Sequence, residues 1–197
     1  MTTSATGMVN NLYSKVFEVY EPLIDTRGVR EEPVLVVFSA IPGSGKSELT
    51  KRLVRDYGFL RVANKDVRES TAVTHHEDDV SAGDYTLWLL DKLTEKRKYS
   101  IVLDRNVDQW YEPSIEWAER NGYEYRLVRV DVAPEILDRR LMRREKDRSA
   151  KAFEYLDFYS DEHRKMGLKL RPSYSLKDDY NLELAAKTIA GGANNHA

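Results

Sequence analysis

One short stretch, from Ala40 to Ser47, constrains this chain more than any other. It reads A-I-P-G-S-G-K-S, follows the apolar run from Val34 to Phe38 and precedes the helix-like segment E-L-T-K-R-L-V. Gly43 and Gly45 allow the backbone to curl so that successive N–H groups point inward, and the helix that follows adds its positive end to the same spot. Strand, glycine-rich turn and helix in this order predict a cradle for a polyphosphate rather than a chance turn.

Individual residues of this loop have separate expected roles. The Lys46 ammonium is expected to reach the β- and γ-phosphates, and the Ser47 hydroxyl to ligate Mg²⁺. Pro42 stiffens the loop, and Ala40 is small enough to replace a glycine at the strand-to-loop junction. The residues predicted to hold the nucleotide phosphates are Pro42, Gly43, Ser44, Gly45, Lys46, Ser47 and Glu48.

The composition bounds the class of protein. A chain of 197 residues suits one domain with a sizeable core. Its 31 Lys and Arg nearly balance 33 Asp and Glu, so a nucleic acid or an anionic membrane would need a local basic patch. The absence of cysteine excludes disulfides and thiolate metal sites, and no apolar stretch is long enough to span a bilayer. Without a secretory signal pattern, the expectation is a cytoplasmic protein with no membrane partner. The sequence does not determine the oligomeric state.

Hydrophobic periodicity predicts strands that alternate with helices. Such alternation is typical of an α/β fold, with a parallel sheet of about five strands, helices on both faces and the ligand at the carboxyl ends of the strands. Strands are expected at 34–39, 59–63, 101–103, 125–132 and 173–176. Helices are expected at 9–20, 47–57, 85–97, 112–121, 134–148, 152–166 and 182–190.

This pattern also divides the chain. Residues 1–33 are expected to form an N-terminal helix and a connecting loop, and residues 34–190 a single domain around the phosphate loop. Within that domain, residues from about 134 to 166 are predicted to form a helical lid. Residues 191–197 are predicted to be a flexible tail.

The residues after the loop separate the classes of phosphate-binding proteins. A GTPase switch needs D-x-x-G after the loop and N-K-x-D much later, but here Asp25-Thr-Arg-Gly28 precedes the loop and Asn64-Lys65-Asp66 lacks the intervening residue. A small kinase needs a carboxylate after the second strand, and Asp66 stands there. Its predicted role is to orient an acceptor hydroxyl and take its proton, while Arg68 pairs with an anionic group of the acceptor. The alternative is that Asp66 only caps the next helix.

Two polar residues close the third predicted strand. Asp104 ends a buried apolar run, where a carboxylate without a partner is costly, so it is expected to face a cation or a water network and to bind Mg²⁺ through water. Asn106, two residues later, is placed to donate to a phosphate or to the acceptor. A plain strand-end turn is the alternative for Asn106.

Arginines recur at a spacing of four in the segment from 138 to 148. Arg140, Arg144 and Arg148 fall on one face of the predicted helix. Three stacked cations repel one another without an anion, and such a face suits a lid that covers ATP phosphates and stabilises charge on the transferring group. The alternative is a solvated charged helix, which nearby acidic residues neutralise in part.

The motifs A-I-P-G-S-G-K-S, N-K-D-V-R, I-V-L-D-R-N and R-L-M-R-R occur in this order. Together they resemble the small, AAA-like P-loop kinases of the polynucleotide 5′-hydroxyl kinase type, over about residues 34–190. The resemblance implies the three-layer P-loop nucleoside triphosphate hydrolase fold, ATP as donor, a hydroxyl acceptor, Asp66 as general base, and Arg140 and Arg144 as lid arginines. One departure concerns Arg68, which follows Asp66 by two residues where that family has Asp-x-x-Arg.

These observations predict an ATP- and Mg²⁺-dependent phosphotransferase with an alcohol group as acceptor. A 5′-hydroxyl polynucleotide end is the leading acceptor, because the Asp-x-Asn pairing and the basic lid favour it. The first alternative is a kinase of a small molecule such as a nucleotide, sugar or antibiotic, which the near-neutral charge favours. The second is a nucleotide-binding regulatory or toxin-like protein whose turnover is incidental.

Overall fold

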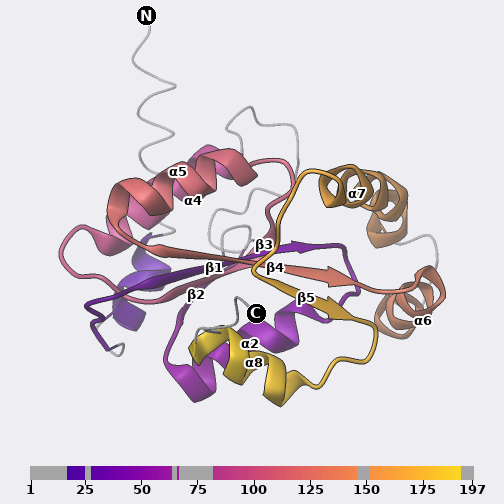
Figure 1. Ribbon diagram of the computed structural model, residues 1–197, viewed down its shortest axis with the longest axis horizontal. Coiled ribbons are helices and arrows are strands. Elements are labelled where there is room, and N and C mark those ends of the chain that lie inside the picture. Colours follow the sequence, from indigo (N-terminus) through magenta and orange to yellow (C-terminus); the bar gives the residue numbers. More distant parts are fainter. Residues whose placement is uncertain (1–16, 25–27, 64–65, 67–81, 146–150, 192–197) are drawn as a thin grey trace, which may run out of the picture.

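In the computed structural model, which describes residues 17–24, 28–63, 66, 82–145 and 151–191, five strands form one sheet (Figure 1). Their order across the sheet is β2-β3-β1-β4-β5, and each neighbouring pair runs parallel. The predicted parallel sheet of about five strands is therefore confirmed. The strands are β1 (Val34–Ala40), β2 (Leu60–Ala63), β3 (Ile101–Asn106), β4 (Glu124–Asp131) and β5 (Tyr174–Lys177).

Helices cover both faces of the sheet, as the alternation of elements predicts. Figure 1 shows α4, α5 and α7 over one face and α2 and α8 over the other, while α6 lies beyond the tips of β4 and β5. Residues 17–24 form a further helix near the N-terminus. The bounds are α2 (Lys46–Tyr57), α4 (Ala82–Thr94), α5 (Tyr111–Asn121), α6 (Pro134–Glu145), α7 (Lys151–Gly167) and α8 (Leu182–Gly191).

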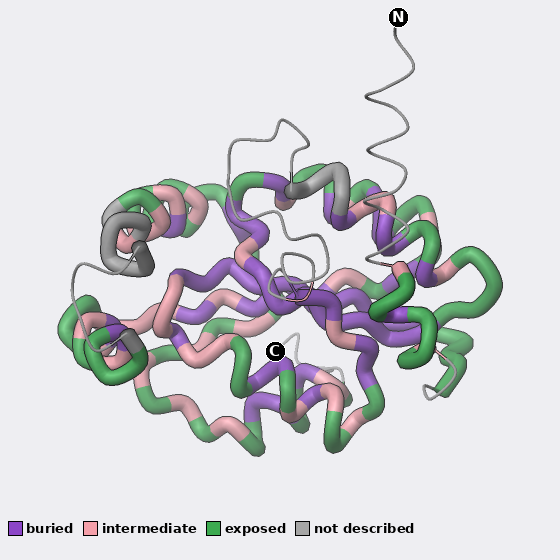
Figure 2. The backbone as a smooth tube through the Cα atoms, turned by 180° about the vertical axis from the view of Figure 1, so that it is seen from behind, coloured by how far each residue is buried: buried purple, intermediate pink, exposed green. Residues whose placement is uncertain are grey.

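The central strand β1 is buried along its whole length. Because successive side chains of a strand point to opposite faces, Leu35 and Val37 enter one core with residues of α4 and α5, and Val36 and Phe38 enter a second core with α2 and α8. Figure 2 shows the same division, with a buried sheet between helices that each expose one side. A strand covered on both faces needs an unbroken apolar run, which is what the sequence before the loop provides.

Within the described residues, three elements differ from their predicted bounds by more than one residue. β3 continues to Asn106, because it pairs with Phe38 of β1 even though the last three residues are polar. α4 begins at Ala82 and ends at Thr94, since the charged run 95–98 offers no apolar face to bury. The first helix extends to residue 24, beyond the predicted end at 20, and its predicted beginning at 9–16 lies outside the described residues.

The topology defines where a ligand belongs. From β1 the chain passes through α2 to β2, which lies toward one edge of the sheet. β4 lies next to β1 toward the opposite edge. A crevice at the carboxyl ends of the strands is the usual ligand site where connections diverge in this way. The phosphate loop follows the carboxyl end of β1. Within the described part of the chain, no helix combines the length and the apolar composition needed to cross a membrane.

Candidate active site around the phosphate loop

The glycine-rich loop between β1 and α2 has the backbone that an anion cradle needs. Gly43 and Gly45 have φ values of 85° and 93°, in the left-handed region that favours glycine. α2 begins at Lys46, and no side chain caps its first N–H groups. The hydroxyl of Ser44 is buried in the loop and has no hydrogen-bond partner among the described residues. The loop therefore combines the positive end of a helix with a buried hydroxyl, a combination that suits a phosphate.

Asp104, at the end of β3, joins the loop in a tight ionic cluster. Its Oδ1 lies 2.6 Å from the Lys46 Nζ and accepts a hydrogen bond of 3.0 Å from the Ser47 hydroxyl. Its Oδ2 accepts two hydrogen bonds from the Arg61 guanidinium, at 2.6 and 3.0 Å. The predicted partnership of Asp104 with a cation is thus met by two protein cations.

Charge and burial oppose each other in this cluster. Burial alone would raise the pKa of Asp104, whose side chain is 3% exposed, but the charges and hydrogen bonds of Lys46 and Arg61 bring that pKa down to about 2. Burial lowers the pKa of Lys46, and the Asp104 carboxylate opposes that effect in part. The carboxylate is therefore ionised throughout the physiological range.

Asp66, the predicted general base, lies just beyond the end of β2 and is half-buried. Its Oδ2 lies 3.5 Å from Arg61 Nη1 and accepts a hydrogen bond of 3.4 Å from the Tyr20 hydroxyl. Arg61 thereby connects Asp66 to the Asp104 cluster at the loop. The structure brings the base candidate and the phosphate-binding residues into one continuous network.

Of the three predicted lid arginines, Arg140 reaches the phosphate loop. Its Nη1 lies 3.4 Å from the Gly43 carbonyl oxygen and 3.3 Å from that of Ser44. Its Nη2 donates to the Asp178 carbonyl at 3.3 Å, after β5. Arg144 is exposed one turn further along α6.

The remaining predicted site residues fall into three groups. Pro42 is half-buried in the loop, and Glu48 is exposed on α2, where it pairs with Lys51 at 2.7 Å. The Asn106 Oδ1 accepts from the backbone N–H groups of Ala40 at 3.2 Å and Asp108 at 3.4 Å. The side-chain oxygen of Asn106 thus serves the strand-end turn, and donation by its nitrogen to a ligand stays a prediction. Two candidates lie outside the described residues, Arg68 and Arg148.

Sequence reasoning missed two members of the network, Arg61 and Tyr20. Arg61 left a detectable signal, because a charged residue interrupts the otherwise apolar strand Leu60–Ala63. Tyr20 left none, since it continues the apolar stripe of a helix and reads as a packing residue. Its hydroxyl nevertheless accepts the Ala63 N–H at 3.1 Å and reaches Asp66.

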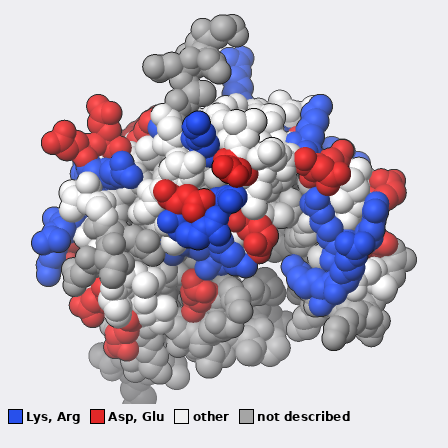
Figure 3. Space-filling view, turned by 90° about the horizontal axis from the view of Figure 1, so that it is seen from below, with Lys and Arg blue, Asp and Glu red and all other residues white. Residues whose placement is uncertain are grey.

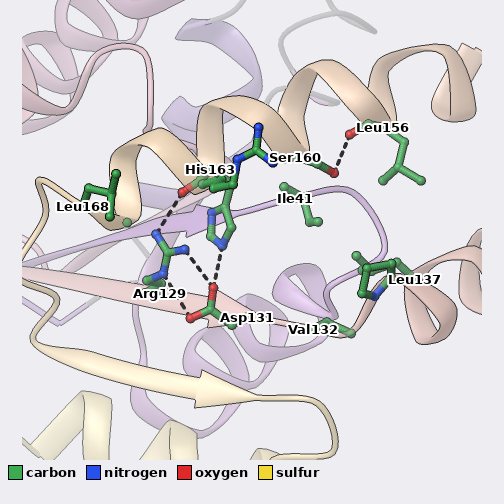
Figure 4. A pocket seen from close by; sticks show the side chains of 12 residues that line it. Ile41, Arg129, Asp131, Val132, Leu137, Leu156, Ser160, His163 and Leu168 are labelled. Atoms are coloured by element: carbon green, nitrogen blue, oxygen red, sulfur yellow. Dashed lines mark hydrogen bonds and ion pairs between the residues drawn. The ribbon is translucent and has the colours of Figure 1, made fainter.

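A cavity of about 590 Å³ lies between α6, α7 and the end of β4 (Figure 4). Ile41 of the phosphate loop lines it, and a polar cluster of Arg129, Asp131 and His163 faces it. His163 Nε2 lies 2.9 Å from Asp131 Oδ1, and its Nδ1 lies 3.1 Å from the Ser39 hydroxyl oxygen. The sheet order places this cavity on the β4 side of β1, away from the base candidate that follows β2.

A comparison with protein families identifies the family of this chain. The profile of a family described as an AAA domain, AAA_33, matches residues 35–159, which is more than half of the chain. The chain belongs to the AAA_33 family. The matched residues run from β1 into α7 and contain the phosphate loop, Asp66, Asp104 and Arg140. The helix at 17–24, β5 and α8 of this AAA_33 protein lie outside them.

Solved structures share the fold of this AAA_33 protein. The APS kinase CysC of Mycobacterium tuberculosis, in complex with AMPPNP and APS, has a TM-score of 0.56 and 13% identity over 82% of this chain and 98% of that chain. The shikimate kinase of Bacteroides thetaiotaomicron has a TM-score of 0.55 and 17% identity, with 80% and 97% covered. The shikimate kinase of Acinetobacter baumannii, in complex with shikimate, has a TM-score of 0.54 and 13% identity over 91% of this chain and 99% of that chain.

These likenesses confirm the predicted P-loop kinase-like fold. At such identities they show the architecture alone, and they do not show the polynucleotide kinase type that the motifs resemble. No curated protein matches the sequence.

Proposed function

We propose that this AAA_33 protein is a kinase that transfers the γ-phosphoryl group of ATP to a hydroxyl group of a small molecule. The observation that carries the proposal is one network that joins phosphate-binding and base candidates. Lys46 and Ser47 at the loop contact Asp104, and Arg61 connects Asp104 to Asp66. A nucleotide-binding protein without transfer chemistry needs the loop but has no use for a carboxylate held opposite it.

The donor set at the loop fits Mg²⁺ and a triphosphate. The Ser47 hydroxyl and the Asp104 carboxylate, 3.0 Å apart, are hard oxygen donors of the kind that Mg²⁺ prefers. When bound, the ion neutralises charge on the phosphates. Lys46 would then exchange its contact with Asp104 for the β- and γ-phosphates, which would also accept hydrogen bonds from the loop amides.

In this mechanism Asp66 orients the acceptor hydroxyl. The acceptor oxygen attacks the γ-phosphorus, the bond from the γ-phosphorus to the β–γ bridging oxygen breaks, and the acceptor proton passes to the Asp66 carboxylate. ADP leaves with the bridging oxygen. Arg140, which already lies over the loop carbonyls, stabilises charge on the transferring group, and Arg144 extends the same helical face.

Two considerations support a small acceptor over a polynucleotide end. The structural neighbours named above are kinases of APS and shikimate, which are small molecules. The net charge is −2, and Figure 3 shows acidic groups beside basic ones over most of the face that it presents, with the largest basic group on the side of α6. A polynucleotide backbone is usually held by a continuous basic track.

An acceptor screen tests the proposal. γ-Labelled ATP and Mg²⁺ are incubated with a panel of small hydroxyl compounds and, separately, with 5′-hydroxyl oligonucleotides. Label transfer to a panel member is expected, whereas transfer only to oligonucleotides, falling steeply with salt, would replace the small-molecule assignment. ATP binding with no acceptor faster than water would instead favour the regulatory alternative.

A variant of the loop lysine and a control on α2 test the binding of ATP at the loop. Lys46→Ala is expected to weaken ATP binding and turnover together, because the lysine contacts the phosphates in both the ground and transition states. Lys51→Ala, an exposed lysine on the same helix, is the matched control and should change neither. Equal ATP affinity in the two variants would contradict the placement of the triphosphate in this loop.

A further inference from the structure

The N-terminal helix at 17–24 delivers one buried hydroxyl to the site. The Tyr20 side chain is fully buried in the core beneath α4 and α5. Its hydroxyl oxygen accepts the Ala63 N–H at 3.1 Å and donates to Asp66 Oδ2 at 3.4 Å. The end of β2 and the carboxylate that follows it are thus tied to the same oxygen atom.

The protonation state of Tyr20 suits this arrangement. Burial raises its pKa well above the ordinary value, the backbone N–H of Ala63 opposes that effect, and the charge of Asp66 adds to it. The hydroxyl therefore keeps its proton at any pH at which the enzyme would work. It is a fixed donor to the carboxylate and does not compete with it for the proton of a substrate.

Arg61 holds the same oxygen of Asp66 from a second direction, at 3.5 Å, while it binds Asp104. Arg61 alone leaves the carboxylate free to swing about a single contact with a long side chain. A second contact from a fully buried ring limits that freedom, because the core around Tyr20 holds the ring in place. Two donors on different elements thereby contact one carboxylate oxygen of Asp66, and in the proposed function the carboxylate takes the proton of the acceptor hydroxyl.

We propose that Tyr20 is a positioning residue for Asp66, so that a helix outside the matched family region 35–159 completes the catalytic site. The inference rests on the proposed function, in which Asp66 is the general base. Misplacing a catalytic group by a fraction of an ångström slows the chemical step but leaves binding of the other substrate intact. By positioning Asp66, Tyr20 affects the rate of the chemical step and leaves the affinity for ATP unchanged.

The test is Tyr20→Phe, which keeps the ring and removes the hydroxyl. The assay is steady-state phosphate release from ATP and Mg²⁺ with water as acceptor, repeated with any acceptor found in the screen. We expect kcat to fall about tenfold at an unchanged KM for ATP. This fall in kcat without a change in the KM for ATP separates a positioning role from a general loss of folded protein.

Tyr125→Phe is the matched control. Tyr125 packs against the same core, and its hydroxyl is paired with Ser114 at 2.9 Å, away from the site. This control should keep the wild-type kcat, although it also loses a hydrogen bond of a tyrosine hydroxyl. Equal kcat losses in Tyr20→Phe and Tyr125→Phe would indicate a packing effect and overturn the inference.

A double-mutant cycle with Asp66→Asn completes the test. Tyr20→Phe should have no further effect on the residual rate of Asp66→Asn, because there is no longer a base to position. If Asp66→Asn is inactive and Tyr20→Phe matches the wild type, the positioning role is wrong and the proposed function stands. If Asp66→Asn keeps full activity, the general base is wrong, and the role of Tyr20 falls with it.

Discussion

Replacing Asp104 with Asn gives the sharpest test of the ionic cluster at the loop. The change removes one buried charge and leaves two cations, Lys46 and Arg61, whose side chains are only 16% and 24% exposed. Breaking a buried pair by removing one partner typically costs about 3 to 5 kcal/mol. We expect the free energy of unfolding of Asp104→Asn at pH 7 to fall by that amount.

Part of this stability depends on pH. The drop in the Asp104 pKa from its ordinary 3.8 to about 2 is worth roughly 2.5 kcal/mol at neutral pH. Because the folded-state pKa is depressed, this contribution is complete above about pH 4 to 5 and is lost as the pH falls through about 2. At pH 3, roughly 1 kcal/mol of it has gone, so the stability gap between wild type and Asp104→Asn should narrow by that much.

Urea unfolding of both proteins at pH 7 and pH 3 measures this difference. Asp56→Asn is the matched control, because Asp56 also pairs with two arginines, Arg52 and Arg55, but on the surface of α2. Its effect on stability should be small at both pH values. A cost below about 1 kcal/mol for Asp104→Asn at pH 7, or the same gap at both pH values, would refute the buried cluster described above.

Three further predictions concern the loop and the frame around it. Gly45→Ala should destabilise the fold by about 1 to 2 kcal/mol and weaken ATP binding measured by calorimetry, since a residue with a side chain is strained at φ 93°. Gly28→Ala, where an added Cβ would meet no atom within 4 Å, should change neither stability nor ATP binding. His163→Leu should lower the free energy of unfolding by about 1 to 3 kcal/mol in urea titration, because it leaves the fully buried Asp108 carboxylate without its imidazole neighbour at 3.4 Å. Arg126→Leu should cost about 2 kcal/mol in thermal unfolding, since the buried guanidinium binds carbonyl oxygens in the last turn of α8; an unchanged Tm would contradict that contact.

Sequence alone determined the parts of this protein that depend on local order. The apolar run before the loop predicted a strand buried on both faces, and glycines at 43 and 45 predicted the curled backbone that φ values of 85° and 93° confirm. A carboxylate at the end of a buried strand predicted a cation or a water network beside Asp104. Lys46 and Arg61 lie beside it, and Mg²⁺ binding by Asp104 stays a prediction. The strand and the loop could be predicted because each depends on neighbours within a few residues along the chain, whereas the identity of the cations beside Asp104 depends on the fold.

Tertiary structure decided which distant residues meet. Arg61 reaches Asp104 because β2 pairs with β3 in a register that sets Ala63 opposite Asp104, and no local pattern fixes that register. Tyr20 reaches Asp66 because a helix of the N-terminal region packs under the end of β2, 46 residues away along the chain. Side chains that bridge separate elements are positioned by the packing of the whole core, so the sequence names the candidate groups and only the fold shows what holds them in place.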